Sequence, residues 1–341
     1  MSAVYDWKIE VIRNGVTIGE LTALDCEILF DENADVKRSG KITFPIGLET
    51  IEFDAFRDRI RPVMIKGANE SQLGKYMVIS MPESLSDTGS VYQIEMYDET
   101  MILHQAAMES RVYYAAGTSY QAVIEALLVE CGLYDYSFTP TVSVLNSDRE
   151  FAPGENYLKI INTLLDEINY EHIHAGLDGV LYLVPKVSKS SADHVYTDRR
   201  AYGLMKPIHR DTDIFSLPNV LVGVVSNPDE DTPLIYKIEN TDPSSKISIP
   251  SRGYKVTKIY KLSNIASQQD LEDYITAEYL KSTQTTETAE FDTAAEPGHE
   301  FGDMVSLSTK LISGLYREVG WSMRLGVRET MHHKLERKVF V

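Results

Sequence analysis

The sequence predicts a β-rich α+β protein in which two β-barrel or sandwich domains bracket a small α+β insert domain. Three observations predict this class. Short alternating segments separated by turn residues fill the first hundred residues, helical spacing of apolar residues marks the middle, and alternation then returns. We place the domains at residues 1–105, 106–205 and 206–341, the last with one helix and a C-terminal strand.

The strongest local signal is a hairpin at the start of the chain. Trp7, Ile9 and Val11 alternate with other residues, and Asn14-Gly15 offers a type I′ turn before a second strand over 16–21. Many short strands separated by turns favour a barrel or a sandwich. Further strands are expected at 26–30, 41–45, 61–65, 75–79 and 91–97.

The middle of the chain predicts two helices. The first begins at Thr118, which is a good N-cap with Gln121 in the capping-box position, and Gly132 closes it. The second begins near 154–156 and runs to Ile168 on an apolar stripe. A short hairpin of 171–174 and 180–184 completes a small α+β module.

The last third returns to β structure. Strands are predicted over 219–225 and 234–238, joined by an acidic turn, and one helix over 268–283. Because the last strand ends the chain, we expect it to be free to complete a sheet or to extend into a neighbouring molecule. The remaining strands are expected at 287–293, 304–308, 316–325 and 334–341.

Bulk composition excludes several classes of protein. The net charge of −18 argues against binding to nucleic-acid backbones and to anionic membranes. Cys26 and Cys131 form no CxxC motif, so we expect two buried thiols rather than a disulfide framework. Residues 1–10 lack the pattern of a signal peptide and no apolar run approaches about 18 residues. We therefore expect synthesis in the cytosol and no membrane span.

Two segments resemble binding motifs. The stretch 67–75 resembles a phosphate loop, but its spacing is two residues too long and Tyr76 stands where Ser or Thr must meet magnesium, so a hairpin loop is expected. His172 and His174 would share one face of a strand and could begin a zinc site, with His194 as the nearest further candidate. Partly exposed strand histidines are the favoured interpretation.

No other segment predicts catalysis. His332-His333 is not part of an HExxH motif, because Glu336 lies on the wrong side, and a surface strand or turn is expected. The acidic turn 229–231 and the pair Arg199-Arg200 read as solvated charges. No Gly-x-Ser-x-Gly elbow occurs. We predict no catalytic, cofactor-binding or metal-binding residues, no cofactor and no enzymatic activity.

Four groups of segments, in order along nearly the whole chain, carry a resemblance to a known family. They are 58–64 with 73–80, 93–98 with 102–103, 149–154 with 158–170, and 321–323 with 333–339. In their order and spacing these segments resemble the baseplate hub proteins of contractile-tailed phages and phage-tail-like bacteriocins.

The resemblance implies a homotrimer with two tube-like β domains in each chain, so that three chains match the six-fold tail tube to the three-fold spike. It implies contacts with the tube protein, the central spike, the tape-measure protein and the baseplate wedge, and a location in the baseplate of a particle. A central channel is also implied. Solubility is the favoured interpretation of the acidic charge, and our hypothesis is that part of this charge lines the channel, where it would repel DNA; the alternative is that the charge lies outside. The alternative function is a tail-associated cell-wall hydrolase that acts during penetration; a carbohydrate-binding β module is a third.

Overall fold

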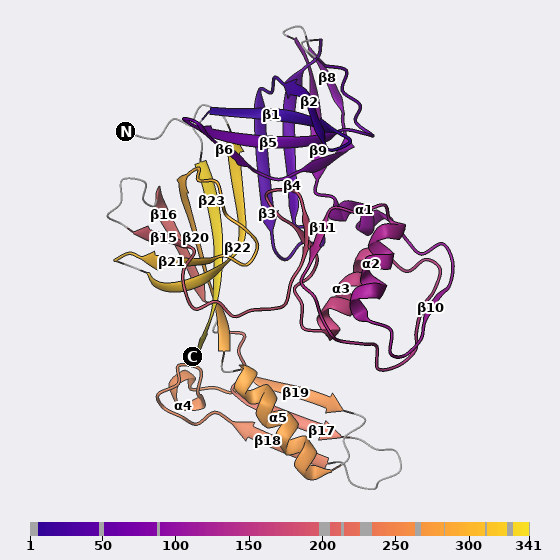
Figure 1. The fold of residues 1–341 in the computed structure, drawn as a ribbon. Helices are drawn as coiled ribbons and strands as arrows, with labels where there is room; N and C mark the ends of the chain where they lie inside the picture. Colours follow the sequence, from indigo (N-terminus) through magenta and orange to yellow (C-terminus); the bar gives the residue numbers. More distant parts are fainter. Residues whose placement is uncertain are drawn as a thin grey trace. The chain divides into compact units, whose positions relative to one another are not determined.

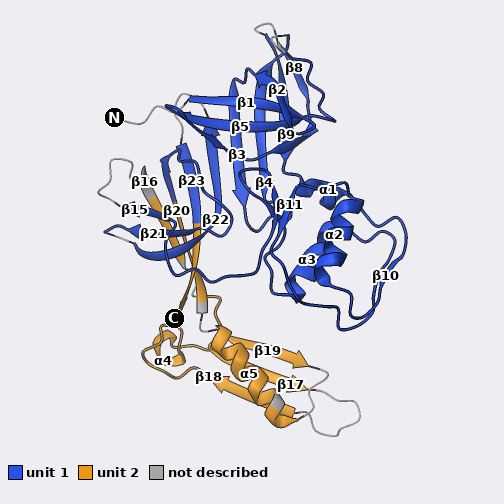
Figure 2. Ribbon diagram, viewed as in Figure 1, with its two compact units in different colours: residues 1–207, 291–334 blue, residues 208–290, 335–341 orange. Residues whose placement is uncertain are grey.

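The structure is a computed structural model that describes residues 6–47, 51–86, 89–197, 205–212, 215–225, 234–262, 267–282, 284–310, 312–325 and 330–340. The chain forms two compact units (Figure 2). Unit 1 holds residues 1–207 and 291–334, and unit 2 holds 208–290 and 335–341. The boundaries of the three predicted domains stay a prediction.

The first hundred residues form strands at almost every predicted place. Asn14 and Gly15 have φ values of 50° and 78°, as a type I′ hairpin turn requires. The predicted first hairpin is confirmed. The strands are β1 (Asp6–Arg13), β2 (Val16–Leu21), β3 (Asp25–Asp31), β4 (Arg38–Pro45), β5 (Arg59–Lys66), β6 (Asn69–Gln72), β7 (Tyr76–Ser80), β8 (Glu83–Ser86) and β9 (Gly89–Tyr97).

Strands from residue 194 onward join the same sheet. They are β15 (His194–Thr197), β16 (Met205–Thr212), β20 (Gln284–Ala294), β21 (Met304–Ser308), β22 (Ser313–Leu325) and β23 (Thr330–Phe340). The sheet has 15 strands, and its main path runs β16-β20-β23-β22-β3-β4-β9-β7-β5-β1-β2 (Figure 1). The described strands follow an open path rather than a closed barrel.

One pairing connects the two ends of the sequence. β22 runs antiparallel to β3, with Trp321 opposite Phe30, and these two rings lie 6.0 Å apart. The C-terminal strand β23 lies between β20 and β22, so it is hydrogen-bonded on both sides. Of the two expected roles for the last strand, completing a sheet is confirmed, because β20 and β22 flank it within its own chain.

The predicted α+β module is present in unit 1. α2 begins after Ser119, and Thr118 donates its hydroxyl to the Ala115 carbonyl, so the capping box predicted at Thr118 is wrong. The second helix is correctly capped, because the Asn156 side chain accepts from the Lys159 amide. The elements are α1 (Thr100–Gln105), β10 (Val112–Tyr114), α2 (Tyr120–Glu130), β11 (Tyr136–Phe138), β12 (Arg149–Phe151), α3 (Tyr157–Glu167), β13 (His174–Ala175) and β14 (Leu181–Leu183).

Unit 2 holds a small sheet with one helix on it. β17 pairs antiparallel with β18 and parallel with β19, and the sequence did not predict β19. α5 lies over this sheet (Figure 1). Its Leu271 and Ile275 share one buried core with Leu221 and Val225. The elements are β17 (Val220–Val225), β18 (Leu234–Glu239), α4 (Ile249–Arg252), β19 (Thr257–Leu262) and α5 (Gln268–Ser282).

The β-rich α+β class is confirmed. Within the described ranges, none of the helices has both the length and the apolar character needed to cross a bilayer.

Candidate functional site

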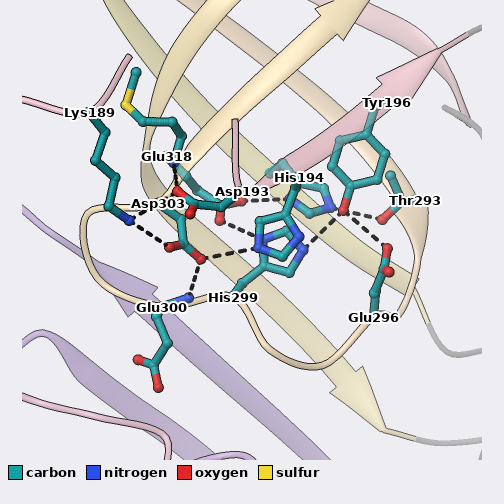
Figure 3. Close-up of polar contacts among 12 residues, drawn as sticks. Lys189, Asp193, His194, Tyr196, Thr293, Glu296, His299, Glu300, Asp303 and Glu318 are labelled. Carbon is teal, nitrogen blue, oxygen red and sulfur yellow. Dashed lines mark hydrogen bonds and ion pairs between the residues drawn. The ribbon is translucent and has the colours of Figure 1, made fainter. Parts of the chain in front are cut away.

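A cluster of polar side chains is buried inside unit 1 (Figure 3). Its centre is the Glu318 carboxylate on β22. Glu318 Oε2 lies 2.6 Å from His299 Nδ1, and Glu318 Oε1 lies 2.7 Å from Nδ1 of His333 on β23. All three side chains are buried, so solvent and a diffusing substrate have no access to the carboxylate.

The other ring nitrogens also have polar partners. His333 Nε2 lies 2.8 Å from Thr293 Oγ1, and His299 Nε2 lies 3.0 Å from the Tyr196 hydroxyl. The His194 ring stacks on the His299 ring with 3.7 Å between centroids. One hydrogen-bonded and stacked network therefore contains side chains from β15, β20, β22 and β23 and from the segment before β21.

Burial and hydrogen bonding compete at this centre. Burial raises the pKa of Glu318, but the two imidazoles that contact it outweigh burial and lower that pKa to about 2. Burial lowers the pKa of His333, and burial raises the pKa of Tyr196. Burial also acts to lower the pKa of His194, but Asp303, whose Oδ2 lies 3.1 Å from Nε2, raises it overall.

The structure separates the histidines that sequence spacing grouped together. His172 Nε2 lies 3.0 Å from Asp166 at the protein surface. His174 is buried, not partly exposed as predicted, and its ring stacks on Phe301 with 3.9 Å between centroids. His194 faces Asp303. These three histidines have different partners and form no common group.

His332 and His333 lie on a strand, as predicted, but on opposite faces. His332 is exposed and pairs with Asp292, whereas His333 is 0% exposed. The surface position expected for His333 is wrong, because alternation along β23 aligns it with the buried Met331 and Leu335. That alternation was the available signal. Nothing local in sequence marked Glu318 or His299 as its partners.

The phosphate-loop-like segment is a hairpin, as predicted. Gly67 has a φ of 63° at the turn, and β6 pairs back on β5. The Lys75 ammonium forms ion pairs with Asp135 and Glu99, at 2.9 and 3.2 Å. The buried Tyr76 hydroxyl donates to the Leu73 carbonyl. The acidic turn 229–231 and the pair 199–200 lie outside the described residues.

A second buried charge lies at Arg38, which is 1% exposed. Its Nε donates to the Ala175 carbonyl and its Nη2 to Glu300 Oε2, at 2.7 and 2.6 Å. The guanidinium also lies over the rings of Phe30 and Trp321, at 5.3 and 5.7 Å. Such contacts stabilise a buried cation. Arg38 thus connects three distant parts of the sequence inside unit 1.

A pocket beside α3 has a volume of about 660 Å³ and is open to solvent. Its lining histidines are already paired, His104 with Asp35 and His172 with Asp166. Neither histidine is therefore placed as a free catalytic base. The pocket does not add a reactive group to the site described above.

Comparison with known proteins gives a likeness of fold without a likeness of sequence. No protein-family model matches the chain, and no curated protein sequence matches it. The tail protein from Neisseria meningitidis MC58 superimposes with a TM-score of 0.65 at 11% identity, covering 97% of this chain and 96% of that protein. The 43 kDa tail protein of prophage MuSo2 from Shewanella oneidensis gives 0.64 at 9% identity, covering 96% and 98%.

A third likeness is to the Escherichia coli c3393 protein, a type VI secretion component described as similar to the T4 bacteriophage tail proteins gp27 and gp5. Its TM-score is 0.53 at 10% identity, with 97% of this chain and 77% of that one covered. The resemblance to tail hub proteins predicted from the sequence is confirmed at the level of fold. The chain has the fold of phage tail proteins.

Proposed function

We propose that this chain is a structural hub of a phage-type baseplate, in which three copies form a ring that adapts a six-fold tail tube to a three-fold spike. The likeness of fold to tail proteins over almost the whole chain supports this proposal. The particle is either a DNA-carrying phage or a headless killing device.

The observation that carries the proposal is the β22–β3 pairing. It places strands from the first and last parts of the chain side by side in one sheet. In this proposal the strands on either side of the β22–β3 pairing act as two segments of the sheet, so that three chains offer six. A ring of three subunits would then present repeats that match a six-fold partner.

The β2 edge is a candidate contact between neighbouring subunits. β2 ends the main path of the sheet, and its Val16 and Ile18 side chains are 64% and 37% exposed. An apolar edge strand offers unpaired backbone groups together with apolar surface, which favours pairing with another chain. The tube protein, the spike, the tape-measure protein and the baseplate wedge are the further partners in this proposal.

The proposal includes a purely structural role. The central carboxylate Glu318 is sealed from solvent, so it is not placed to act on a polymer such as cell wall. A zymogram on purified cell wall is expected to show no clearing by the isolated chain. Clearing that persists after rigorous purification would instead support the hydrolase alternative.

The oligomeric state is the direct test. Native mass spectrometry of the untagged chain, alone and co-expressed with the spike protein of the same particle, is expected to give assemblies of three chains of 38.4 kDa each. A chain that stays monomeric both alone and with the spike contradicts the hub. Electron microscopy of the particle then locates the ring at the junction of tube and spike.

A further inference from the structure

Two imidazoles and one carboxylate converge in the interior of unit 1. The side chains of His299, Glu318 and His333 are 1%, 0% and 0% exposed. One ligand atom from each lies within 4.8 Å of the other two. We propose that this cluster is a structural binding site for one divalent transition-metal ion, with zinc as the best match.

The surroundings of His333 allow it to act as a ligand through Nδ1. The Thr293 hydroxyl lies 2.9 Å from the Ala294 carbonyl and 2.8 Å from His333 Nε2. When the hydroxyl donates to the carbonyl, its oxygen accepts from Nε2–H. A neutral imidazole has one N–H, so in that tautomer the Nδ1 lone pair of His333 faces Glu318 Oε1, 2.7 Å away.

The same arrangement recurs at His299. The Tyr196 hydroxyl lies 3.4 Å from the Glu296 carboxylate and 3.0 Å from His299 Nε2. When the hydroxyl donates to Glu296, its oxygen accepts from Nε2–H, and the Nδ1 lone pair of His299 faces Glu318 Oε2 at 2.6 Å (Figure 3).

In these tautomers two lone pairs and a carboxylate face one another, and a single metal ion satisfies all three ligand atoms at once. In the opposite tautomers each Nδ1–H donates to Glu318, so metal binding is accompanied by a shift of each ring proton to Nε2.

The ligand set selects the type of ion. Two histidine nitrogens with one carboxylate suit zinc, whereas calcium and magnesium prefer oxygen alone. Zinc bonds of about 2.0–2.2 Å in a tetrahedral site separate ligand atoms by roughly 3.4 Å. The short nitrogen–oxygen contacts thus open by less than about 1 Å when the ion enters. Glu318 can supply a fourth ligand atom by binding through both oxygens, which lie closer together than two tetrahedral positions and so distort the geometry of the site.

The surroundings match those of protein metal sites. Histidines that bind metal usually donate their other N–H to an oxygen, which fixes the ring and the tautomer. Thr293 and Tyr196 supply those oxygens here. With no ligand exposed, the ion would hold β22, β23 and the segment before β21 together and would add its binding energy to folding.

The test is the metal content of the untagged full-length chain. After expression with zinc and exhaustive dialysis, elemental mass spectrometry is expected to find one zinc ion per chain. Unfolded chain refolded with cobalt is expected to show the visible absorption of tetrahedral cobalt. His299→Gln and His333→Gln should each lower bound metal at least tenfold.

Two matched variants control for surface binding. His332→Gln removes the exposed neighbour of His333, and His172→Gln removes another exposed histidine; both should keep one ion per chain. The proposal is overturned if the wild-type chain holds less than a tenth of an equivalent and gains none on refolding with zinc. It is also overturned if both cluster variants keep their metal. The wild-type measurements decide the matter even where a variant fails to fold.

Discussion

Arg38 and Glu300 stand 262 residues apart in the sequence, yet their side chains form an ion pair with 2.6 Å between Nη2 and Oε2. The other Glu300 oxygen accepts from the Leu177 amide, and Arg38 Nε donates to the Ala175 carbonyl. One buried cation therefore joins β4, the α+β module and the segment before β21 within unit 1. Stability should depend strongly on this contact.

Arg38→Ala is expected to lower the free energy of unfolding by about 1–3 kcal/mol, because it leaves the buried Ala175 carbonyl without its donor and removes the contacts of the buried guanidinium. Urea unfolding followed by circular dichroism measures this loss. Arg324→Ala is the matched control, since the Arg324–Asp25 pair is exposed and should contribute only about 0–1 kcal/mol. Equal losses in the two variants would contradict the central role of Arg38.

The ionisation of Asp58 should make the free energy of unfolding depend on pH in the acid range. Hydrogen bonds from Arg13, the shorter at 2.7 Å, hold the pKa of Asp58 below its usual value. Its contribution is thus complete above the unfolded-state pKa of about 3.9 and is lost as the pH falls through the lower folded-state pKa. Asp58→Asn should remove this acid-dependent step and cost about 1.5–3 kcal/mol at neutral pH.

Unfolding free energies measured from pH 2 to pH 7 test the role of Asp58. The exposed Asp6 is the control, and Asp6→Asn should leave the profile close to wild type. If Asp58→Asn has the same pH profile as the wild type, the pKa of Asp58 is the same in the folded and unfolded chains and the prediction is wrong.

Gly223 lets α5 lie close to β17. A Cβ at this position would lie 2.6 Å from Ile275 Cγ1 and 2.7 Å from Leu271 Cδ1. Gly223→Val should destabilise unit 2 by about 1–3 kcal/mol through overpacking. Hydrogen exchange at residues 268–282 should accelerate, while Val222→Thr, on the other face of β17, should not change it. If exchange in Gly223→Val is unchanged, α5 packs on β17 equally well with a side chain at residue 223, and the prediction is wrong.

The two thiols should differ in reactivity. Cys26 is fully buried, and burial raises its pKa strongly; burial also raises the pKa of Cys131 to about 11. Since the thiolate is the reactive form, native Cys131 should react with Ellman's reagent at pH 8 on the order of 100-fold more slowly than free cysteine, and Cys26 should not react. Both thiols should react at once in denaturant. Fast labelling of the native chain would refute this.

The β2 edge should be needed for assembly rather than for folding. Val16→Lys with Ile18→Lys places two charges on the exposed side of the edge strand. The double variant should keep the wild-type unfolding midpoint but weaken the trimer at least tenfold, since buried charge opposes edge pairing. Val142→Lys, at a site that is 99% exposed in the α+β module, should leave assembly unchanged. A double variant that assembles normally would exclude β2 as the contact.

Elements that depend on local signals were predicted well. The Asn14-Gly15 turn, the helix after Asn156 and α5 all follow from turn chemistry, a side-chain cap or apolar periodicity. The failures have tertiary causes. Thr118 could cap a helix, but a turn with Ala115 takes its hydroxyl. β19 has charged and aromatic residues on a short strand, and only its parallel partner β17 makes it regular.

The sequence by itself determined the secondary structure that neighbouring residues can specify, the β-rich class and the acidic character of the chain. The tertiary structure alone decided which strands pair across the chain, that the final strand lies inside the sheet, and that His299, Glu318 and His333 meet. Hydrogen bonds in turns and helices join residues a few positions apart, so the neighbouring sequence is enough to specify them. Sheet pairing and buried clusters join residues far apart, and their partners are selected only when the whole core packs.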